Sequence, residues 1–333
     1  MLRAAGLRAA GRHLVSVSAA DPQPCKARPI RLPPHISGAS AFRRIMRACL
    51  DHLAENQPAA IAGVDDEGVH QARVAIRRLR SALVLFEDYV GAAIALDFRD
   101  RLRDVARVLG EARDWDVFIA ETIPAYSADR AGASVETMVL IAGRLRAEAH
   151  RRVRRTLTDP AHHDFLARIE TWVESDGWRA GLGMESFRSL DGFCRALASP
   201  LLARTAKRVH KRGRAIGETP EHQTVEHQTP EQRHELRKAM KKLRYSAEFL
   251  ATLYPPKRVR RYLETAEAMQ DVLGKLNDSA AVVTLLDHLT LEHGRNTAEF
   301  DACRDWAEAG HSNDLHRLEK AWARFETAKP FWD

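Results

Sequence analysis

Cationic side chains recur at helical spacing in the segment HQARVAIRRLRSALVLF, residues 70–86. At about 100° per residue, these side chains share one side of a helix: His70, Arg73, Arg77 and Arg80, with Arg78 at its edge. Positions 70 to 80 hold four arginines and no acid. Guanidinium groups donate forked hydrogen bonds to phosphate and carboxylate oxygens. The segment therefore predicts a helical stripe that binds anions.

The segment HELRKAMKKLRYSAEFL, residues 234–250, repeats this pattern 164 residues later. Its cationic side consists of His234, Arg237, Lys238, Lys241 and Arg244, with Lys242 at the flank. Cations four residues apart on a helix repel each other when no carboxylate lies between them. A solvated face on an ordinary amphipathic helix is the alternative interpretation. Because the same unfavourable arrangement occurs twice, the sequence favours an anion-binding surface, and we call the two cationic sides the basic stripes.

Further cations extend the predicted surface. Those that precede the two stripes occupy matching positions: Arg43, Arg44 and Arg47 before the first, and Lys207, Arg208 and Lys211 before the second. Arg113 and Lys275 belong to two later segments that also match each other. Some of these side chains are expected to be solvated, and those that face the stripes complete the predicted site.

The elements that must position these residues are duplicated helices. The segments VLGEARD (108–114) and VLGKLND (272–278) match at the same offset of 164 residues. Two matches at one offset indicate a duplicated helical half of about 150–165 residues. Two such halves commonly pack around a pseudo-twofold axis and share one core.

Nearly the whole chain after Ala39 has a hydrophobic period near 3.6 residues, which is typical of amphipathic helices. The predicted helices cover residues 39–57, 66–90, 92–126, 132–157, 161–176, 186–216, 230–253, 255–291, 294–310 and 312–328. Their breaks are expected at Gly63, Gly91, Pro124, Pro160, Gly177, Gly217, Pro255–Pro256 and Gly310. No alternating run bounded by turn residues indicates a sheet. The predicted fold class is all-α.

The predicted organisation is an N-terminal extension, residues 1–36, followed by a single domain, residues 37–333, with halves at about 37–180 and 186–330. Residues 1–20 contain Arg and no acid, as in a transit peptide or a frayed terminus. Five prolines make residues 21–36 an extended tether. Segment 217–230 repeats EHQT and is expected to be a flexible polar loop.

Composition narrows the functional classes. The chain has 333 residues, of which 45% are hydrophobic and 29% charged, with a formal net charge of +7. No run approaches 18 uninterrupted apolar residues, so the sequence predicts no membrane-spanning helix. The four cysteines are far apart without a CxxC pair, which argues against a disulfide framework or a thiolate zinc site and for a reducing compartment.

Asp114 and Asp278, which end the second pair of matching segments, admit more than one role. They could serve as acids of a metal or catalytic site, but ion pairing that orients the cations, or capping of a turn, is the favoured interpretation. His70 and His234 either donate to phosphate as neutral rings or fix helix packing. The stripes carry no GxxxxGK[ST], no HExxH and no cluster of acids. We therefore expect no catalytic residue, no metal site and no cofactor.

Two patterns carry a family resemblance: HxxRxxxRRLRxxLxxF followed by LGxxRDxDV, and HxxRxxxKKLRYxxEF followed by LGxxND. Over residues 36–328, roughly, the chain resembles the CHAD family, the conserved histidine α-helical domain. The resemblance implies two helical-bundle halves, related by a pseudo-twofold axis, that enclose a basic groove for inorganic polyphosphate. It also implies association with polyphosphate granules. The EHQT loop, Lys275 and the lack of the ExExK signature of the CYTH triphosphatase are departures.

The sequence and the resemblance together predict a cytoplasmic, non-catalytic protein that binds inorganic polyphosphate, with granule proteins as further partners and no membrane contact. Nucleic-acid binding through the same helices is the alternative. It is disfavoured because Tyr245 is the only aromatic residue close to either stripe, and no helix-turn-helix is evident. A phosphate-releasing enzyme is a more distant third interpretation.

Overall fold

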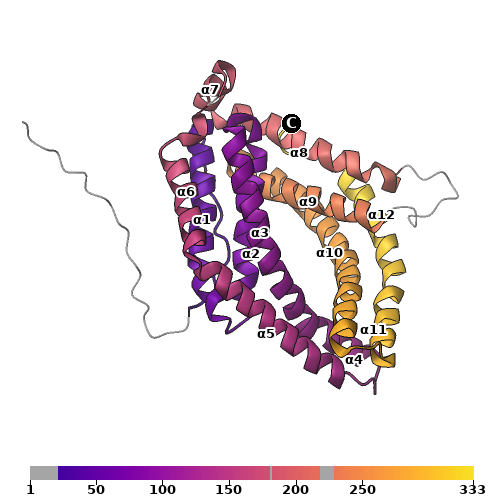
Figure 1. Ribbon diagram of the computed structural model, residues 1–333. Coiled ribbons are helices and arrows are strands. Elements are labelled where there is room, and N and C mark those ends of the chain that lie inside the picture. Colours follow the sequence, from indigo (N-terminus) through magenta and orange to yellow (C-terminus); the bar gives the residue numbers. More distant parts are fainter. Residues whose placement is uncertain (1–21, 181, 218–228) are drawn as a thin grey trace, which may run out of the picture.

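The computed structural model describes residues 22–180, 182–217 and 229–333, and Figure 1 shows that they form helices. The first part contains α1 (Gly38–Ala62), α2 (Glu67–Leu85), α3 (Ala92–Val117), α4 (Ile123–Asp129), α5 (Glu136–Thr158), α6 (Pro160–Glu174) and α7 (Met184–Asp191). The second part contains α8 (Cys194–Gly217), α9 (Pro230–Leu250), α10 (Pro256–His293), α11 (Ala298–Ala309) and α12 (His311–Glu326). The described residues contain no strand, only an isolated bridge between Ser37 and Phe193. The all-α fold class is therefore confirmed.

Within the described residues, short turns complete the helical segments. They are the 3-10 turns η1 (Glu87–Tyr89), η3 (Gly177–Arg179) and η5 (Ala251–Leu253), and the π-helical turn η2 (Phe118–Thr122). The break predicted at Pro124 is wrong, because the chain stays helical from α3 through η2 into α4. Pro124 lies at the start of α4, directly after the π-helical turn η2, a widened turn that accommodates a residue without an N–H inside a continuing helix.

The single helix predicted for residues 186–216 is also wrong, because α7 and α8 are separate. The backbone N–H of Gly38 donates to the carbonyl of Gly192 at 3.0 Å, and the N–H of Cys194 donates to the carbonyl of Ile36 at 2.8 Å. These bonds to the chain around the start of α1 replace the helical hydrogen bonds, so the helix is interrupted here.

The apolar sides of the two basic helices face the core. Ile76, Leu79 and Leu83 of α2 are fully buried, and so are Met240 and Leu243 of α9. The buried side of α2 packs on α1, and that of α9 packs on α8 and α10. Because this packing fixes the rotation of α2 and α9 about their axes, it also directs both basic stripes away from the core.

The basic helices meet at the junction of the two parts. α2 packs against α9, while α3 lies beside α2 and α10 beside α9. Figure 1 shows α2 and α3 in purple on one side and α9 and α10 in orange on the other. The stripes are therefore brought together by helices that are far apart in the sequence.

The extended segment after residue 21 is packed onto the helices. The N–H of Cys25 donates to Asn56 of α1, and the N–H of Leu32 donates to Thr252 of η5, each at 2.9 Å. Residues 1–20, and positions 218–228 of the predicted polar loop, lie outside the described residues. Within the described chain, no helix combines the length and apolar character needed to cross a membrane.

Candidate anion-binding site

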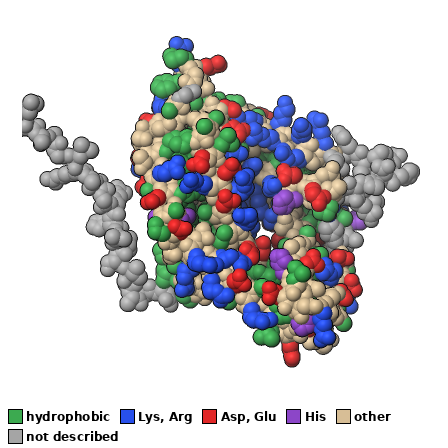
Figure 2. All heavy atoms as spheres, in the orientation of Figure 1, with side chains coloured by type: hydrophobic (Ala, Val, Ile, Leu, Met, Phe, Trp, Pro, Cys, Tyr) green, Lys and Arg blue, Asp and Glu red, His purple; other side chains and the backbone are tan. Residues whose placement is uncertain are grey.

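Four cations from the basic stripes lie close together where α2 packs against α9. Arg73 and Arg77 come from α2, and Arg237 and Lys241 come from α9. The three arginines all disfavour the charged form of Lys241, which shows that they lie within electrostatic reach of it. Figure 2 shows Lys and Arg side chains gathered around a recess near the middle of the visible face. We call these four residues the central cluster.

Two carboxylates accompany the central cluster. Oδ1 of Asp114 on α3 lies 4.0 Å from Nη1 of Arg73, so the predicted ion pairing by Asp114 is present. Burial raises the pKa of Asp114; Arg73 opposes this shift, and the carboxylate of Asp278 on α10 adds to it. Asp278 in turn favours the charged form of Arg237. Four basic side chains therefore lie near two acids, and the three arginines alone are enough to leave the region positive.

The charges of the central cluster are incompletely satisfied. Burial lowers the pKa of Lys241 to about 6, and repulsion by Arg237, Arg77 and Arg73 acts in the same direction. The Nε atoms of Arg77 and Arg237 are buried and have no hydrogen-bond partner among the described residues. Buried donors without partners and crowded like charges are both costly. An anion with several oxygens would accept these hydrogen bonds and reduce the repulsion.

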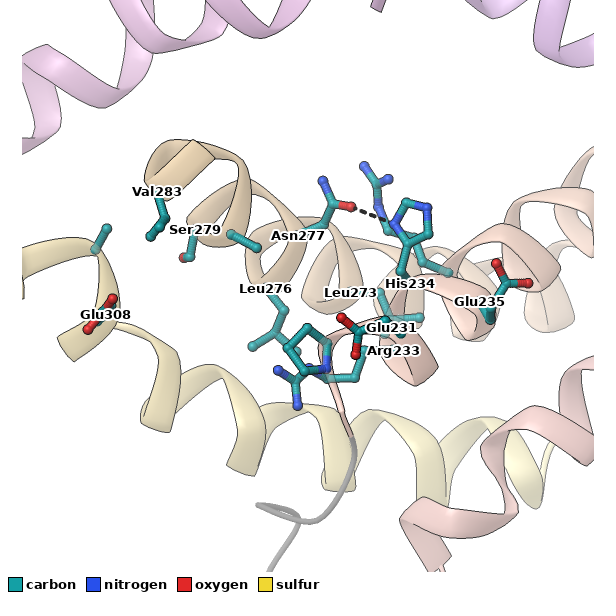
Figure 3. Close-up of a pocket in the computed structure, with 14 residues that line it drawn as sticks. Glu231, Arg233, His234, Glu235, Leu273, Leu276, Asn277, Ser279, Val283 and Glu308 are labelled. Carbon is teal, nitrogen blue, oxygen red and sulfur yellow. Dashed lines mark hydrogen bonds between the residues drawn. The ribbon is translucent and has the colours of Figure 1, made fainter. Parts of the chain in front are cut away.

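The two histidines at the heads of the stripes have different surroundings. Burial lowers the pKa of His70, and repulsion by Arg113 adds to the shift. Nδ1 of His234 lies 3.2 Å from Oδ1 of Asn277 on α10, and Figure 3 shows the two side chains pointing toward each other. His234 is thus an exposed ring held beside α10, whereas His70 is under the electrostatic influence of Arg113, Arg77 and Arg73.

The groove beside His234 has a different character. Its volume is about 560 Å³, and it lies between α9, α10 and α11. Leu273, Leu276 and Val283 make much of its wall apolar, and Glu231 and Glu308 also line it (Figure 3). Arg233 and Arg237 line it as well, but mostly apolar walls with three carboxylates suit a polyanion less well than the central cluster does.

A smaller cavity of about 250 Å³ lies between α2, α3, α8 and α9. Five cations line it: Arg99, Arg208, Arg212, Lys238 and Lys242. The sequence predicted site roles for Arg208, Lys238 and Lys242 but not for Arg99 or Arg212. Arg99 lies on α3 outside the repeated motifs, so only the packing of α3 and α9 reveals it. We call this space the side cavity.

Arg78 requires a correction. Its side chain is buried, and its Nη1 lies 3.0 Å from Oε2 of Glu248 on α9. Nε of Arg244, at the end of the second stripe, lies 3.4 Å from Oε1 of the same Glu248, and its Nη1 lies 3.7 Å from Glu267. Arg78 therefore links α2 to α9 inside the protein and is not available to a ligand.

The remaining predicted cations divide into paired and unpaired groups. Three are paired with acids of neighbouring segments: Arg43 with Asp176, Arg47 with Glu174 and Arg113 with Asp66. Five have no carboxylate within 4.0 Å in the described part of the chain: Arg44, Arg80, Lys207, Lys211 and Lys275. The five unpaired cations extend the positive surface, whereas the three paired cations are largely neutralised by their carboxylates.

No set of three or more His, Cys, Asp or Glu side chains within the described residues is arranged to hold a metal ion.

The CHAD domain family model matches residues 44–287, a range that includes both basic stripes and both acids of the central cluster. The chain belongs to the CHAD domain family. The resemblance carried by the repeated motifs is thus confirmed.

Solved structures are similar in fold to this chain. The crystal structure of the CHAD domain from the plant Ricinus communis is similar over 90% of this chain and 96% of that chain, with a TM-score of 0.75 and 26% identity. PptA from Streptomyces chartreusis is similar over 88% of this chain and 99% of that chain, with a TM-score of 0.59. Its identity of 13% makes this second likeness one of fold alone. No curated protein matches the chain.

Proposed function

We propose that this CHAD protein binds inorganic polyphosphate at the central cluster and does not hydrolyse it. The observation that carries the proposal is the meeting of Arg73, Arg77, Arg237 and Lys241, with buried unpartnered donors, in a protein of this family. In this proposal the two halves are duplicates related by a pseudo-twofold axis. The polymer follows a basic groove between them.

The chemistry of the ligand fits the two kinds of cation present. Each arginine can donate forked hydrogen bonds to non-bridging phosphate oxygens, while Lys241 supplies a compact charge. The ion pair between Arg73 and Asp114 holds one guanidinium in place before the ligand arrives. Because polyphosphate repeats one charged group and has no bases, an array of cations is sufficient to recognise it.

Nucleic acid fits this surface less well. Binding of single strands without sequence preference usually relies on aromatic side chains that stack on bases. Tyr245, the aromatic residue of the second stripe, is buried beside Arg78 and Arg244 and offers no exposed ring. The proposed location is the cytoplasm, on polyphosphate granules, where granule proteins would be further partners.

Reversal of two central charges tests the proposal. The double variant Arg77→Glu with Lys241→Glu should weaken long-chain polyphosphate binding at least about 100-fold, because a hydrogen bond to a charged group contributes about 1.5–3 kcal/mol and 1.4 kcal/mol is tenfold. Titration calorimetry measures the affinity, and far-ultraviolet circular dichroism checks that helix content is retained.

The matched control is Arg144→Glu with Arg151→Glu, which makes the same change in formal net charge on an exposed side of α5. We expect less than about threefold weakening there, since exposed distant charges are screened. Equal losses in the two folded variants would mean that net charge, and not the central cluster, determines binding. Steady phosphate release in the presence of Mg²⁺ would contradict the non-catalytic assignment.

A further inference from the structure

Equivalent positions of α2 and α9 form two reciprocal environments, one closed and one open. In the closed environment, Arg78 of α2 contacts three residues of α9: Tyr245, Glu248 and Phe249. In the open environment, Lys242 of α9 lines the side cavity with three residues of α2: Ser81, Val84 and Leu85. Each residue of one set corresponds to one of the other at the offset of 164 residues. The two environments can therefore be compared position by position.

The closed environment satisfies its cation from within the protein. Nη1 of Arg78 lies 3.0 Å from a carboxylate oxygen of Glu248. The guanidinium carbon lies 5.1 Å from the ring centre of Phe249 and 6.0 Å from that of Tyr245, distances at which cation–π attraction operates. A carboxylate and two aromatic rings thus fill the space around this cation.

The open environment lacks each of these groups. Val84 stands where the closed environment has Glu248, and the smaller Ser81 and Leu85 stand where it has Tyr245 and Phe249. The space that these replacements leave is the side cavity of about 250 Å³. With about 30 Å³ of liquid volume per water molecule, this is room for a compact ligand and not for a long polymer segment.

The charge in the side cavity is positive and only partly balanced. Oε2 of Glu87 lies 3.6 Å from Nη1 of Arg99, and its Oε1 lies 2.5 Å from Nη2 of Arg208. Glu235 forms an ion pair with Lys238. Lys242 and Arg212 have no carboxylate within 4.0 Å in the described part of the chain. Burial lowers the pKa of Lys242, and Arg99, Arg80, Arg208 and Arg212 all act in the same direction.

We propose that the side cavity is a second anion site, separate from the central cluster, that binds a compact phosphate group in the place that the carboxylate of Glu248 occupies beside Arg78. The ligand class is a small inorganic phosphate, such as pyrophosphate, or the terminal phosphate of a polyphosphate chain. Only the chain-end source depends on the proposed function. Lys242 supplies an ammonium group that no carboxylate of the described residues neutralises, and Arg212, whose Nη1 donates to the backbone carbonyl of Arg208 at 3.2 Å, supplies a second cation without a carboxylate partner among them. Arg99 and Arg208 complete the wall.

A carboxylate placed in the cavity tests the proposal. Val84→Glu puts into the open environment the residue type that closes the other one, and the added charge lies among cations, so the variant should fold. We expect pyrophosphate to bind the wild-type protein saturably and Val84→Glu to weaken that binding at least about tenfold, as an intramolecular carboxylate competes for the same donors. Titration calorimetry gives the affinity, and the melting temperature with and without pyrophosphate gives a second readout.

Two further variants locate the effect. Lys242→Met should also weaken pyrophosphate binding, whereas Arg77→Glu with Lys241→Glu should leave it within about threefold, because these residues do not line the cavity. The proposal is overturned if pyrophosphate does not bind the wild type saturably, if Val84→Glu and Lys242→Met leave its affinity unchanged, or if the central variant abolishes it. Loss of polyphosphate binding alone in the central variant would concern only the proposed function.

Two ligands with equal numbers of phosphorus atoms test whether the side cavity binds the terminal phosphate of a polyphosphate chain. Linear tripolyphosphate has terminal phosphates, and cyclic trimetaphosphate has none. If the cavity takes a terminal group, the linear form binds and is sensitive to Val84→Glu, while the cyclic form does not compete with pyrophosphate. Equal binding of both, unaffected by Val84→Glu, would contradict a site at this cavity.

Discussion

Lys241 shows how a single side chain can report on the ligand. Arg73 and Arg77 approach it from α2 and Arg237 from its own helix, while Asp278 of α10 is the acid that opposes them. Burial and these cations lower the pKa of Lys241 to about 6. The amine is therefore mostly neutral at pH 7 in the free protein, and a polyanion that binds there would restore its proton.

Proton uptake on binding is the first consequence. Below pH 6 Lys241 is charged with or without ligand, so pH has no effect through this group. Above pH 6 only the complex holds the proton, so affinity should fall as pH rises, by up to about tenfold per unit. Polyphosphate should therefore bind at least about tenfold more tightly near pH 6 than near pH 8.

Calorimetry in buffers of different ionisation enthalpy measures this proton directly. Lys241→Arg is the matched control, because a guanidinium keeps its charge throughout the range and should give a flatter pH profile with binding retained. An unchanged slope in that variant would assign the pH dependence to another group.

The sequence predicted correctly which residues share one side of a helix, because helical spacing alone decides this. The stripes and their buried opposite sides follow from helical periodicity, and both were placed correctly on α2 and α9. The roles of Arg78 and Lys242 did not follow, although they occupy equivalent positions. Glu248 neutralises Arg78 from 170 residues away in sequence, and no local pattern identifies such a partner.

At the scale of helices, Gly213 explains how α12 approaches α8. A Cβ at this position would overlap the six-membered ring of Trp322, which is almost fully buried. The sequence marks Gly213 only as a weak helix former inside a predicted helix. The need for glycine at position 213 comes from the contact with Trp322 of α12, which is distant in sequence, so sequence analysis could not predict it.

Gly213→Ala should destabilise the protein despite the better helix propensity of alanine. Overpacking a rigid ring contact costs about 1–3 kcal/mol, and we expect a net loss of about 2 kcal/mol in the free energy of unfolding. Denaturant titration followed by circular dichroism measures it. Gly143→Ala in α5 is the control, because no atom lies within 4 Å of the added Cβ, and it should stabilise by up to about 1 kcal/mol. A neutral Gly213→Ala would mean that α12 moves freely away from α8.

Over the whole molecule, the arrangement of charge is more informative than its sum. A net charge of +7 on 333 residues is modest, yet the central cluster and the side cavity each collect cations from helices that belong to different parts of the chain. The sequence predicted the helices and the repeated stripes because both are local patterns. It did not predict the division of the basic surface into two regions, because that depends on how α2, α3, α8 and α9 pack together.

This arrangement predicts how salt affects binding. If polyphosphate behaves as DNA does, the logarithm of the affinity falls linearly with the logarithm of salt concentration, with a slope of about −0.9 for each charge contact. Engagement of the four central cations then gives a slope of about −3.6 or steeper, and removal of two charges in Arg77→Gln with Lys241→Gln should make it shallower by about 1.8.

Titrations of long-chain polyphosphate over a range of salt concentrations, beside single- and double-stranded DNA at matched phosphate concentration, supply the slopes. A dedicated site binds polyphosphate far more tightly than either DNA at every salt concentration, because the central cluster offers donors for phosphate and no exposed ring for bases. Equal affinities that weaken together, with a slope that the double variant leaves unchanged, would show that the basic surface binds any polyanion and would remove the ground for a polyphosphate-specific function.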